Sequence, residues 1–249
     1  MSDRTTLVCL PFAGAGASFY RPWQRLADQH APGIDILPLQ LPGRERLIDE
    51  EPYRDAATAA DGLLADLLGQ LGEAPQPHRI ALFGHSLGAV LAYELARRLA
   101  ETPGVTLLGL FASGSPHPAE QRERRATGLD DDAFLERVNE FAGYTHEALQ
   151  DPEMRELILP TLRADVEMHE SYAPAGGEPL PLPVPVTCLR GAEDTLVSRA
   201  EAAAWERTTD SAFRAAELPG GHMYLTESAP ELLRIVAEDL ARVREDQCV

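Results

Sequence analysis

The sequence has no lysine, only three cysteines and no apolar run long enough to span a membrane. All 22 basic residues are arginine, and 40 acidic residues bring the formal net charge to −18. A chain this acidic is poorly suited to nonspecific nucleic-acid binding. The cysteines have no metal-binding spacing and are too few for a disulfide scaffold, and the N-terminal residues lack the layout of a secretory signal. We therefore expect a cytoplasmic protein without nucleic-acid, membrane or metal partners.

Apolar runs alternate with amphipathic segments along most of the 249 residues, which are 44% hydrophobic. This alternation with short links predicts a single domain (1–249) with a mostly parallel central sheet and helices on both faces. The expected strands are Thr6–Leu10, Ile34–Leu39, Ile80–Phe83, Val105–Ala112, Val184–Leu189 and Phe213–Leu218. The expected helices of this alternating part are Ser18–Gln29, Tyr53–Leu71, Ala89–Ala96, Ser198–Thr208 and Pro230–Arg244.

The alternation breaks between about residues 115 and 183, where no strand-like run occurs. Helices are expected there from about Asp130 to Ala142 and from about Pro152 to Tyr172. An apolar stripe on the first of them contains Phe134, Val138 and Phe141 at helical spacing. Helices inserted after the fourth strand would lie over the carboxyl ends of the sheet, where ligands bind. We therefore expect a helical lid with this stripe facing the substrate, although the stripe could instead simply pack on the domain.

The segment Gly84-His85-Ser86-Leu87-Gly88 lies between a buried strand and an apolar helix. A Gly-x-Ser-x-Gly pattern in this context predicts the nucleophile elbow of an α/β-hydrolase fold, in which the serine adopts strained backbone angles. The glycines leave room for the strand and the helix to approach each other. Ser86 is thus the expected nucleophile, beside a helix N-terminus whose N–H groups can receive negative charge. A plain strand-to-helix turn is the alternative.

A nucleophilic serine needs a base and an acid, and the hydrolase fold takes them in the order serine, acid, histidine. His222 suits the base, because it follows the last strand on a Gly-Gly turn and precedes the final helix. The acid should follow a strand end, and Glu193 and Asp194 both do. Asp194 is favoured since it should lie at the apex of the turn, and Glu193 is the alternative. The six histidines set aside are His30, His78, His85, His117, His146 and His169.

A glycine-rich loop follows the first strand. Gly14 and Gly16 form an incomplete dinucleotide-binding pattern, because no third glycine follows and no acidic residue closes the second strand. The hydrolase fold draws a second oxyanion donor from this region, so the backbone N–H of about Ala13 is expected to serve in that role.

With these motifs in place, the sequence resembles the stand-alone (type II) thioesterases that accompany modular polyketide and nonribosomal peptide synthases. The resemblance runs the length of the chain and is carried by Leu10-Pro11-Phe12-Ala13-Gly14, Leu41-Pro42-Gly43-Arg44, the elbow, Leu129–Leu135, Leu159–Asp165, Gly191-Ala192-Glu193-Asp194 and Gly220-Gly221-His222-Met223. It implies a Ser86–Asp194–His222 triad, Leu87 and Ala13 as oxyanion donors, and a lid over about 115–183. One departure is Gly14-Ala15-Gly16, where many relatives have adjacent glycines.

The resemblance also implies the substrate, an acyl group on the phosphopantetheine thiol of an acyl or peptidyl carrier protein, with no cofactor of the enzyme's own. Carrier proteins are acidic, as is this chain, so docking of a monomeric enzyme would need a local basic patch. The candidates are Arg44, Arg46, Arg122, Arg124 and Arg125. Two other functions stay open: a general esterase or acyl-CoA hydrolase with the same triad, and a non-catalytic hydrolase fold that serves as a binding module.

Overall fold

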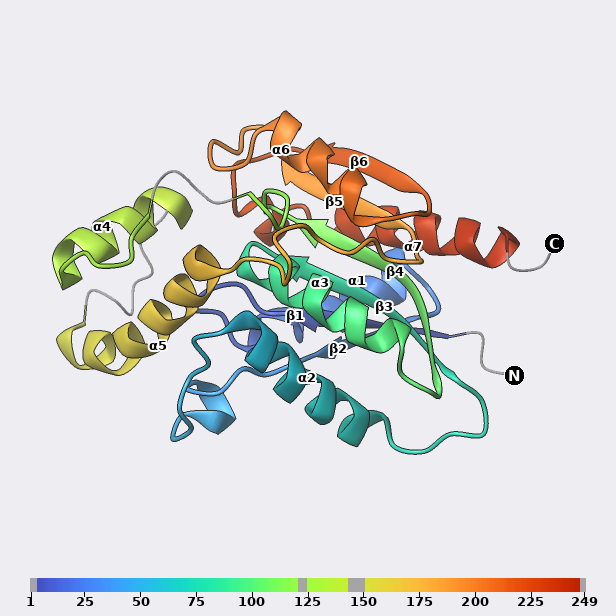
Figure 1. The fold of residues 1–249 in the computed structure, drawn as a ribbon, viewed down its shortest axis with the longest axis horizontal. Helices are drawn as coiled ribbons and strands as arrows, with labels where there is room; N and C mark the ends of the chain where they lie inside the picture. The colour runs from blue at the N-terminus through green and yellow to red at the C-terminus, as the bar shows by residue number, and fades with distance from the viewer. Residues whose placement is uncertain (1–3, 121–124, 143–150, 247–249) are drawn as a thin grey trace.

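A single six-stranded parallel sheet forms the centre of the molecule in the computed structural model, which describes residues 4–120, 125–142 and 151–246 (Figure 1). The strand order is β2-β1-β3-β4-β5-β6, and every neighbouring pair is parallel. The strands are β1 (Thr5–Leu10), β2 (Ile34–Pro38), β3 (His78–His85), β4 (Val105–Ser113), β5 (Val186–Gly191) and β6 (Phe213–Leu218). The expected mostly parallel sheet is confirmed.

Helices cover both faces of the sheet, as the alternation predicts. On one face, α2 (Ala56–Leu71) and α3 (Leu87–Ala100) pack on the sheet in a core that also holds Trp205. On the other face, α1 (Trp23–His30) and α7 (Ala229–Asp246) close a second core. The central strand β3 lies between the two cores, and its residues from Ile80 to Phe83 are fully buried. This double burial explains why that strand reads as a continuous apolar run.

The first expected helix, Ser18–Gln29, is wrong as a single element. The structure has a short 3₁₀ helix, η1 (Ala17–Tyr20), followed by α1 from Trp23. Pro22 lies at the junction and has no N–H to continue a helical ladder, so the two helical segments are separate. Ser18 lies inside η1, and its backbone N–H donates to the side chain of Glu45.

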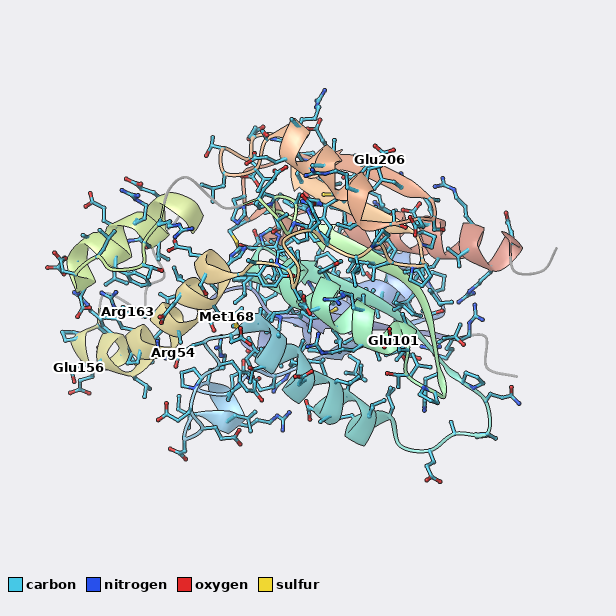
Figure 2. All side chains as sticks on the ribbon, viewed as in Figure 1. Arg54, Glu101, Glu156, Arg163, Met168 and Glu206 are labelled. Atoms are coloured by element: carbon cyan, nitrogen blue, oxygen red, sulfur yellow. The ribbon has the colours of Figure 1, made fainter. Side chains whose placement is uncertain are left out.

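Two helices occupy the inserted region, and Figure 1 shows them beyond one end of the sheet. They are α4 (Asp131–Ala142) and α5 (Pro152–Ser171), each begun by an aspartate, since Asp130 and Asp151 accept backbone N–H groups of the first turn. The carboxyl half of α5 is anchored in the main core through Met168, whereas Glu156 lies at its outer end (Figure 2). The inserted helices are thus held mainly by the second half of α5.

After α5 the chain returns to the sheet as β5. Between β5 and β6 lie α6 (Arg199–Ala203), which Ser198 and Glu201 begin with a reciprocal capping box, and the 3₁₀ helix η4 (Ala204–Thr208). Cys9 and Cys188 are buried free thiols, and burial raises the pKa of both. Within the described ranges no helix is long and apolar enough to cross a membrane, and no group of three or more His, Cys, Asp or Glu residues could hold a metal.

Candidate active site

Ser86 lies in the tight turn between β3 and α3, at the carboxyl end of the sheet. Its φ and ψ are 53° and −117°, a conformation that non-glycine residues rarely adopt. Its backbone N–H donates to the carbonyl of Ser113 at the end of the neighbouring strand, at 2.8 Å. The strained turn predicted from the sequence is therefore confirmed, and it is tied to the sheet on one side.

The two glycines of the elbow are required by close backbone contacts. A Cβ at Gly84 would lie 1.9 Å from the carbonyl oxygen of Gly88, and a Cβ at Gly88 would lie 2.5 Å from the carbonyl oxygen of Leu10. No side chain could be accommodated at either position without moving backbone. The glycines thus let α3 begin directly against the ends of β3 and β1.

Asp194 and His222 meet at the same edge of the sheet. His222 Nδ1 lies 2.9 Å from Asp194 Oδ2, and the other carboxylate oxygen accepts the N–H groups of Leu196 (2.8 Å) and Val197 (3.2 Å). Burial raises the pKa of Asp194, but the hydrogen bond and charge of His222 and the two backbone donors outweigh it, so the pKa lies below its usual value. Because the ionised carboxylate only accepts, Nδ1 of His222 carries a proton and Nε2 is the nitrogen left for chemistry.

The alternative acid, Glu193, points to solvent. Its side chain is exposed, whereas Asp194 is 6% exposed and contacts His222. The turn that decides between them is held by hydrogen bonds from Glu193 N to Gly220 O and from Asp194 N to Gly191 O. The geometry thus places the aspartate, and not the glutamate, against the imidazole.

A contact between two turns brings Asp194 and His222 together. A Cβ at Gly191, where β5 ends, would lie 2.1 Å from the carbonyl oxygen of Gly221, next to His222. We expect Gly191→Ala to push the two turns apart, lower kcat, and cost about 1–3 kcal/mol of unfolding free energy, a typical overpacking penalty. Urea unfolding and ester hydrolysis measure both effects.

Gly69 provides the control for that substitution. It lies inside α2 with nothing within 4 Å of an added Cβ. Gly69→Ala is expected to stabilise the protein by up to about 1 kcal/mol and to leave kcat unchanged. Equal kcat values in the two variants would contradict the role given to the Gly191 contact.

Ser86 and His222 both line one cavity of about 570 Å³. The loop after β1 contributes Phe12 and Ala13 to its wall, and α5 contributes residues between Met154 and Glu170, most of them apolar. The α5 residues that line it include Met154, Leu157, Ile158, Leu162 and Val166. A serine hydroxyl and an imidazole therefore lie at the wall of one cavity, which suits an apolar chain.

The two expected oxyanion donors come from different segments, the elbow and the loop after β1. Leu87 is the first residue of α3, where backbone N–H groups have no intrahelical acceptor. Ala13 lies in a turn closed by a 2.9 Å hydrogen bond from Ala15 N to Phe12 O, and it lines the cavity. Across the described residues, no protein acceptor takes the Ala13 N–H.

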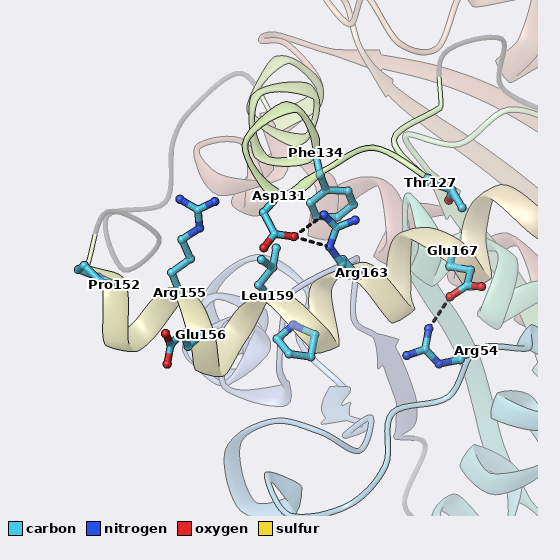
Figure 3. A pocket seen from close by; sticks show the side chains of 12 residues that line it. Arg54, Thr127, Asp131, Phe134, Pro152, Arg155, Glu156, Leu159, Arg163 and Glu167 are labelled. Carbon is cyan, nitrogen blue, oxygen red and sulfur yellow. Dashed lines mark hydrogen bonds and ion pairs between the residues drawn. The ribbon is translucent and has the colours of Figure 1, made fainter.

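Among the stripe residues whose side chains the structure describes, Val138 lines the cavity and Phe134 does not. Phe134 is wrong as a substrate-facing residue: it is 1% exposed and packs between the inserted helices, with the Arg163 guanidinium 4.3 Å from its ring (Figure 3). The side chain of Phe141 is outside the described residues. The helical spacing predicts that the whole stripe faces the substrate, but Phe134 packs in the contact between α4 and α5.

The predicted basic patch loses one member. Arg44 is 8% exposed and forms a bidentate ion pair with Asp165, so it is unavailable for docking, and that expectation is wrong. Arg46 is exposed, as is Arg125. Arg122 and Arg124 lie outside the described residues. The sequence contained no local sign of the Arg44–Asp165 pair, whose partners are 121 residues apart.

A buried polar chain behind the imidazole was also missed. His85 Nδ1 lies 2.8 Å from Ser113 Oγ, which lies 2.7 Å from the hydroxyl of Tyr224, and the rings of His85 and His222 are 4.8 Å apart. Burial raises the pKa of Tyr224, which therefore stays a neutral phenol. His85 thus belongs to the packing around the elbow.

The chain is similar to known thioesterases over nearly its whole length. A family model described as "Thioesterase domain" matches residues 5–240. Thioesterase PikA5 of Streptomyces venezuelae is 34% identical over 96% of this chain and 82% of that protein, and the gramicidin S biosynthesis protein GrsT of Aneurinibacillus migulanus is 31% identical over 95% and 89%. Among solved structures, the type II thioesterase BorB from the borrelidin biosynthetic cluster has a TM-score of 0.80 at 36% identity, covering 95% of this chain and 93% of BorB.

Proposed function

The chain belongs to the thioesterase family, and we propose that this thioester hydrolase removes acyl groups from the phosphopantetheine thiol of acyl or peptidyl carrier proteins. Its relatives support this assignment. BorB is a type II thioesterase of a biosynthetic cluster, and YbtT, with a TM-score of 0.80 at 31% identity, is one from the yersiniabactin NRPS/PKS pathway. The proposed task is the editing or release of stalled and mis-primed chains on such a synthase.

The proposal rests mainly on the positions of Ser86, His222 and Asp194, which all lie at the carboxyl edge of the sheet. Ser86 and His222 share a cavity, and Asp194 holds Nδ1 of His222 at 2.9 Å. This is the set needed to make a hydroxyl nucleophilic at neutral pH.

In the proposed mechanism, Ser86 Oγ attacks the thioester carbonyl while His222 Nε2 takes its proton. Asp194 keeps the imidazole in the required tautomer and stabilises the imidazolium. The N–H groups of Leu87 and Ala13 receive the oxyanion. The C–S bond then breaks and the thiol leaves with the proton from His222. Water, activated by the same imidazole, hydrolyses the acyl-serine in the second half of the reaction.

The lining of the cavity supports an acyl group as the substrate. Most of the α5 residues that line it are apolar, and Thr161, His169 and Glu170 are the polar ones. Ile48, Met154 and Leu157 at its wall are 41%, 41% and 51% exposed. An acyl chain would replace water along these side chains, which favours binding by the hydrophobic effect. Helices α4 and α5 are proposed to act as the lid over this site. Arg122, Arg124 and Arg125 stay the predicted contact for the acidic carrier.

The proposal is tested with one acyl group presented in three ways: on a carrier protein, on coenzyme A and on N-acetylcysteamine. We expect kcat/KM to be at least about tenfold higher with the carrier, since a docked carrier adds about 1.4 kcal/mol or more of transition-state binding. Acyl release is followed by chromatography, with Ser86→Ala as the blank. Equal or faster hydrolysis of the coenzyme A thioester would identify a general acyl-CoA hydrolase instead.

A further inference from the structure

A buried ion pair joins the inserted helix α5 to the loop after β2. Arg44 Nη1 lies 2.6 Å from Asp165 Oδ2, and Arg44 Nη2 lies 2.7 Å from Asp165 Oδ1. The two residues are 8% and 1% exposed. Two parallel charge-assisted hydrogen bonds fix both the distance and the orientation of the partners. Such a pair is a weak source of stability, because desolvation offsets much of the attraction. Stability alone therefore does not explain why this pair is buried in a bidentate geometry.

The same pair also holds the loop after β1. Asp165 Oδ2 accepts the backbone N–H of Gly14 at 2.8 Å, and Arg44 Nη1 donates to the carbonyl of Ala15 at 3.0 Å. One carboxylate and one guanidinium thus bind a backbone donor and a backbone acceptor in consecutive residues. This loop contains Ala13, the proposed second oxyanion donor.

These contacts set the direction of the Ala13 N–H. Gly14 has a φ of +78°, as the third residue of a type II turn does, and Ala15 N closes the turn on Phe12 O. Because the Phe12 carbonyl and the Ala13 N–H belong to one trans peptide, turning the carbonyl into the turn directs the N–H out of it. Asp165 fixes the next peptide plane through the Gly14 N–H. Both planes that flank Ala13 are therefore restrained.

Packing by α5 reinforces the arrangement. Leu162 Cδ1 lies 3.1 Å from where a Gly14 Cβ would be, and Thr161 Oγ1 donates to the carbonyl of Gly43 at 2.9 Å. One turn of α5 thus contacts both loops.

We propose that Arg44 and Asp165 are positioning residues that hold the Ala13 N–H in place for the oxyanion and make its placement depend on the seating of α5. This inference rests on the proposed function, since it takes Ala13 as an oxyanion donor. Asp165 is not among the residues that line the cavity. Arg44 lines it, but its guanidinium is bound to Asp165 and to the carbonyl of Ala15. Both residues act through the turn from Phe12 to Ala15, and loss of the pair should weaken the transition state more than substrate binding.

The decisive variant removes both charges together. Arg44→Met with Asp165→Leu leaves no unpaired buried charge, and apolar replacement of a buried pair is often neutral or stabilising. It nevertheless removes the acceptor for the Gly14 N–H. We expect kcat toward an acyl-N-acetylcysteamine thioester to fall about 100-fold, the effect of losing one oxyanion donor, with KM within about threefold. Rates are counted per active site, titrated with a fluorophosphonate.

A matched control comes from the same helix. Glu167, two residues beyond Asp165, pairs with Arg54 across an exposed contact, drawn in Figure 3. The double variant Arg54→Met with Glu167→Leu makes the same chemical change on the surface. Exposed pairs contribute little, so kcat should stay within about twofold of the wild type.

A transition-state analogue separates positioning from a purely structural role. Ser86 Oγ adds to the carbonyl carbon of an alkyl trifluoromethyl ketone and gives its proton to His222. The carbonyl oxygen of the ketone then becomes an oxyanion in the site. The affinity of the ketone should fall by the same factor as kcat/KM in the Arg44/Asp165 double variant. In Asp165→Asn, which keeps one acceptor oxygen for Gly14 N, the loss should be smaller.

A double variant with wild-type kcat per titrated site, or a lower kcat with unchanged ketone affinity, would overturn the inference. Loss of fold in the double variant while Asp165→Asn keeps full ketone affinity would overturn it as well, by giving the pair a structural role alone. A wild-type enzyme inactive toward every thioester and ester would instead reject the proposed function. The two failures are therefore distinguishable.

Discussion

Ser86→Ala is expected to lower kcat by about 10⁶-fold, the scale seen when a serine hydrolase loses its nucleophile. The side chain lies in a strained turn at the wall of the cavity that also holds His222. Alanine removes one oxygen, so the fold should be retained. Single-turnover release of the acyl group from a loaded carrier protein, together with labelling by a fluorophosphonate, measures the effect.

Ser115→Ala is the control, because Ser115 is a buried serine near the end of β4 whose hydroxyl contacts only a backbone carbonyl among the described interactions. It should keep kcat within about threefold, as is usual for a substitution away from the reacting groups. Hydrolysis that persisted in Ser86→Ala would leave the chain with a thioesterase fold but a different nucleophile.

Asp194→Asn is expected to reduce kcat by roughly 10³–10⁴-fold with little change in KM. An asparagine carbonyl at this place can still accept one hydrogen bond, but an amide that turns its NH₂ toward Nδ1 stabilises the wrong imidazole tautomer. It also lacks the charge that stabilises the imidazolium. Steady-state kinetics on an acyl-N-acetylcysteamine thioester, with circular dichroism to check the fold, measure the loss.

Glu193→Gln provides the matched control, since it makes the same carboxylate-to-amide change one residue earlier on an exposed side chain. It should leave kcat within about twofold, as surface substitutions usually do. The opposite pattern, with activity lost in Glu193→Gln and kept in Asp194→Asn, would transfer the acid to Glu193.

The same carboxylate should influence stability at acid pH. The pKa of Asp194 is lower in the folded protein than in the unfolded chain, where aspartate titrates near about 3.9. Its contribution is therefore present above about pH 3.9 and is lost as the pH falls through the lower, folded-state value. Denaturant unfolding should show a shallower acid loss of stability for Asp194→Asn than for the wild type.

Much of this site was predictable from local sequence. The elbow could be predicted because a buried strand, a glycine-flanked serine and an apolar helix are contiguous in the sequence. The backbone strain at Ser86 comes from short-range sterics. His222 followed from chain order, since parallel strands place their carboxyl ends at one edge of the sheet. The inserted helices were expected because no strand-like run occurs there and, for the first of them, because its apolar residues recur at helical spacing.

Other features depended on packing between distant segments. From the sequence, Arg44 is expected to be a free surface cation. The structure pairs it with Asp165, which lies 121 residues away in the chain. Phe134 reads as part of a substrate-facing stripe until α5 covers it. Nothing within a few residues of either position reports these contacts, because helical periodicity gives a face but not its neighbour.

The sequence by itself thus determined the alternating strands and helices, the nucleophile turn and the order of the candidate groups, all of which depend on backbone sterics and hydrophobic periodicity. Only the tertiary structure placed Asp194 rather than Glu193 against His222. It also buries Arg44 against Asp165 and links α5 to the loop that carries Ala13. The physical reason is range: local preferences act over a few residues, whereas burial and ion pairing are decided by which distant surfaces the folded chain presses together.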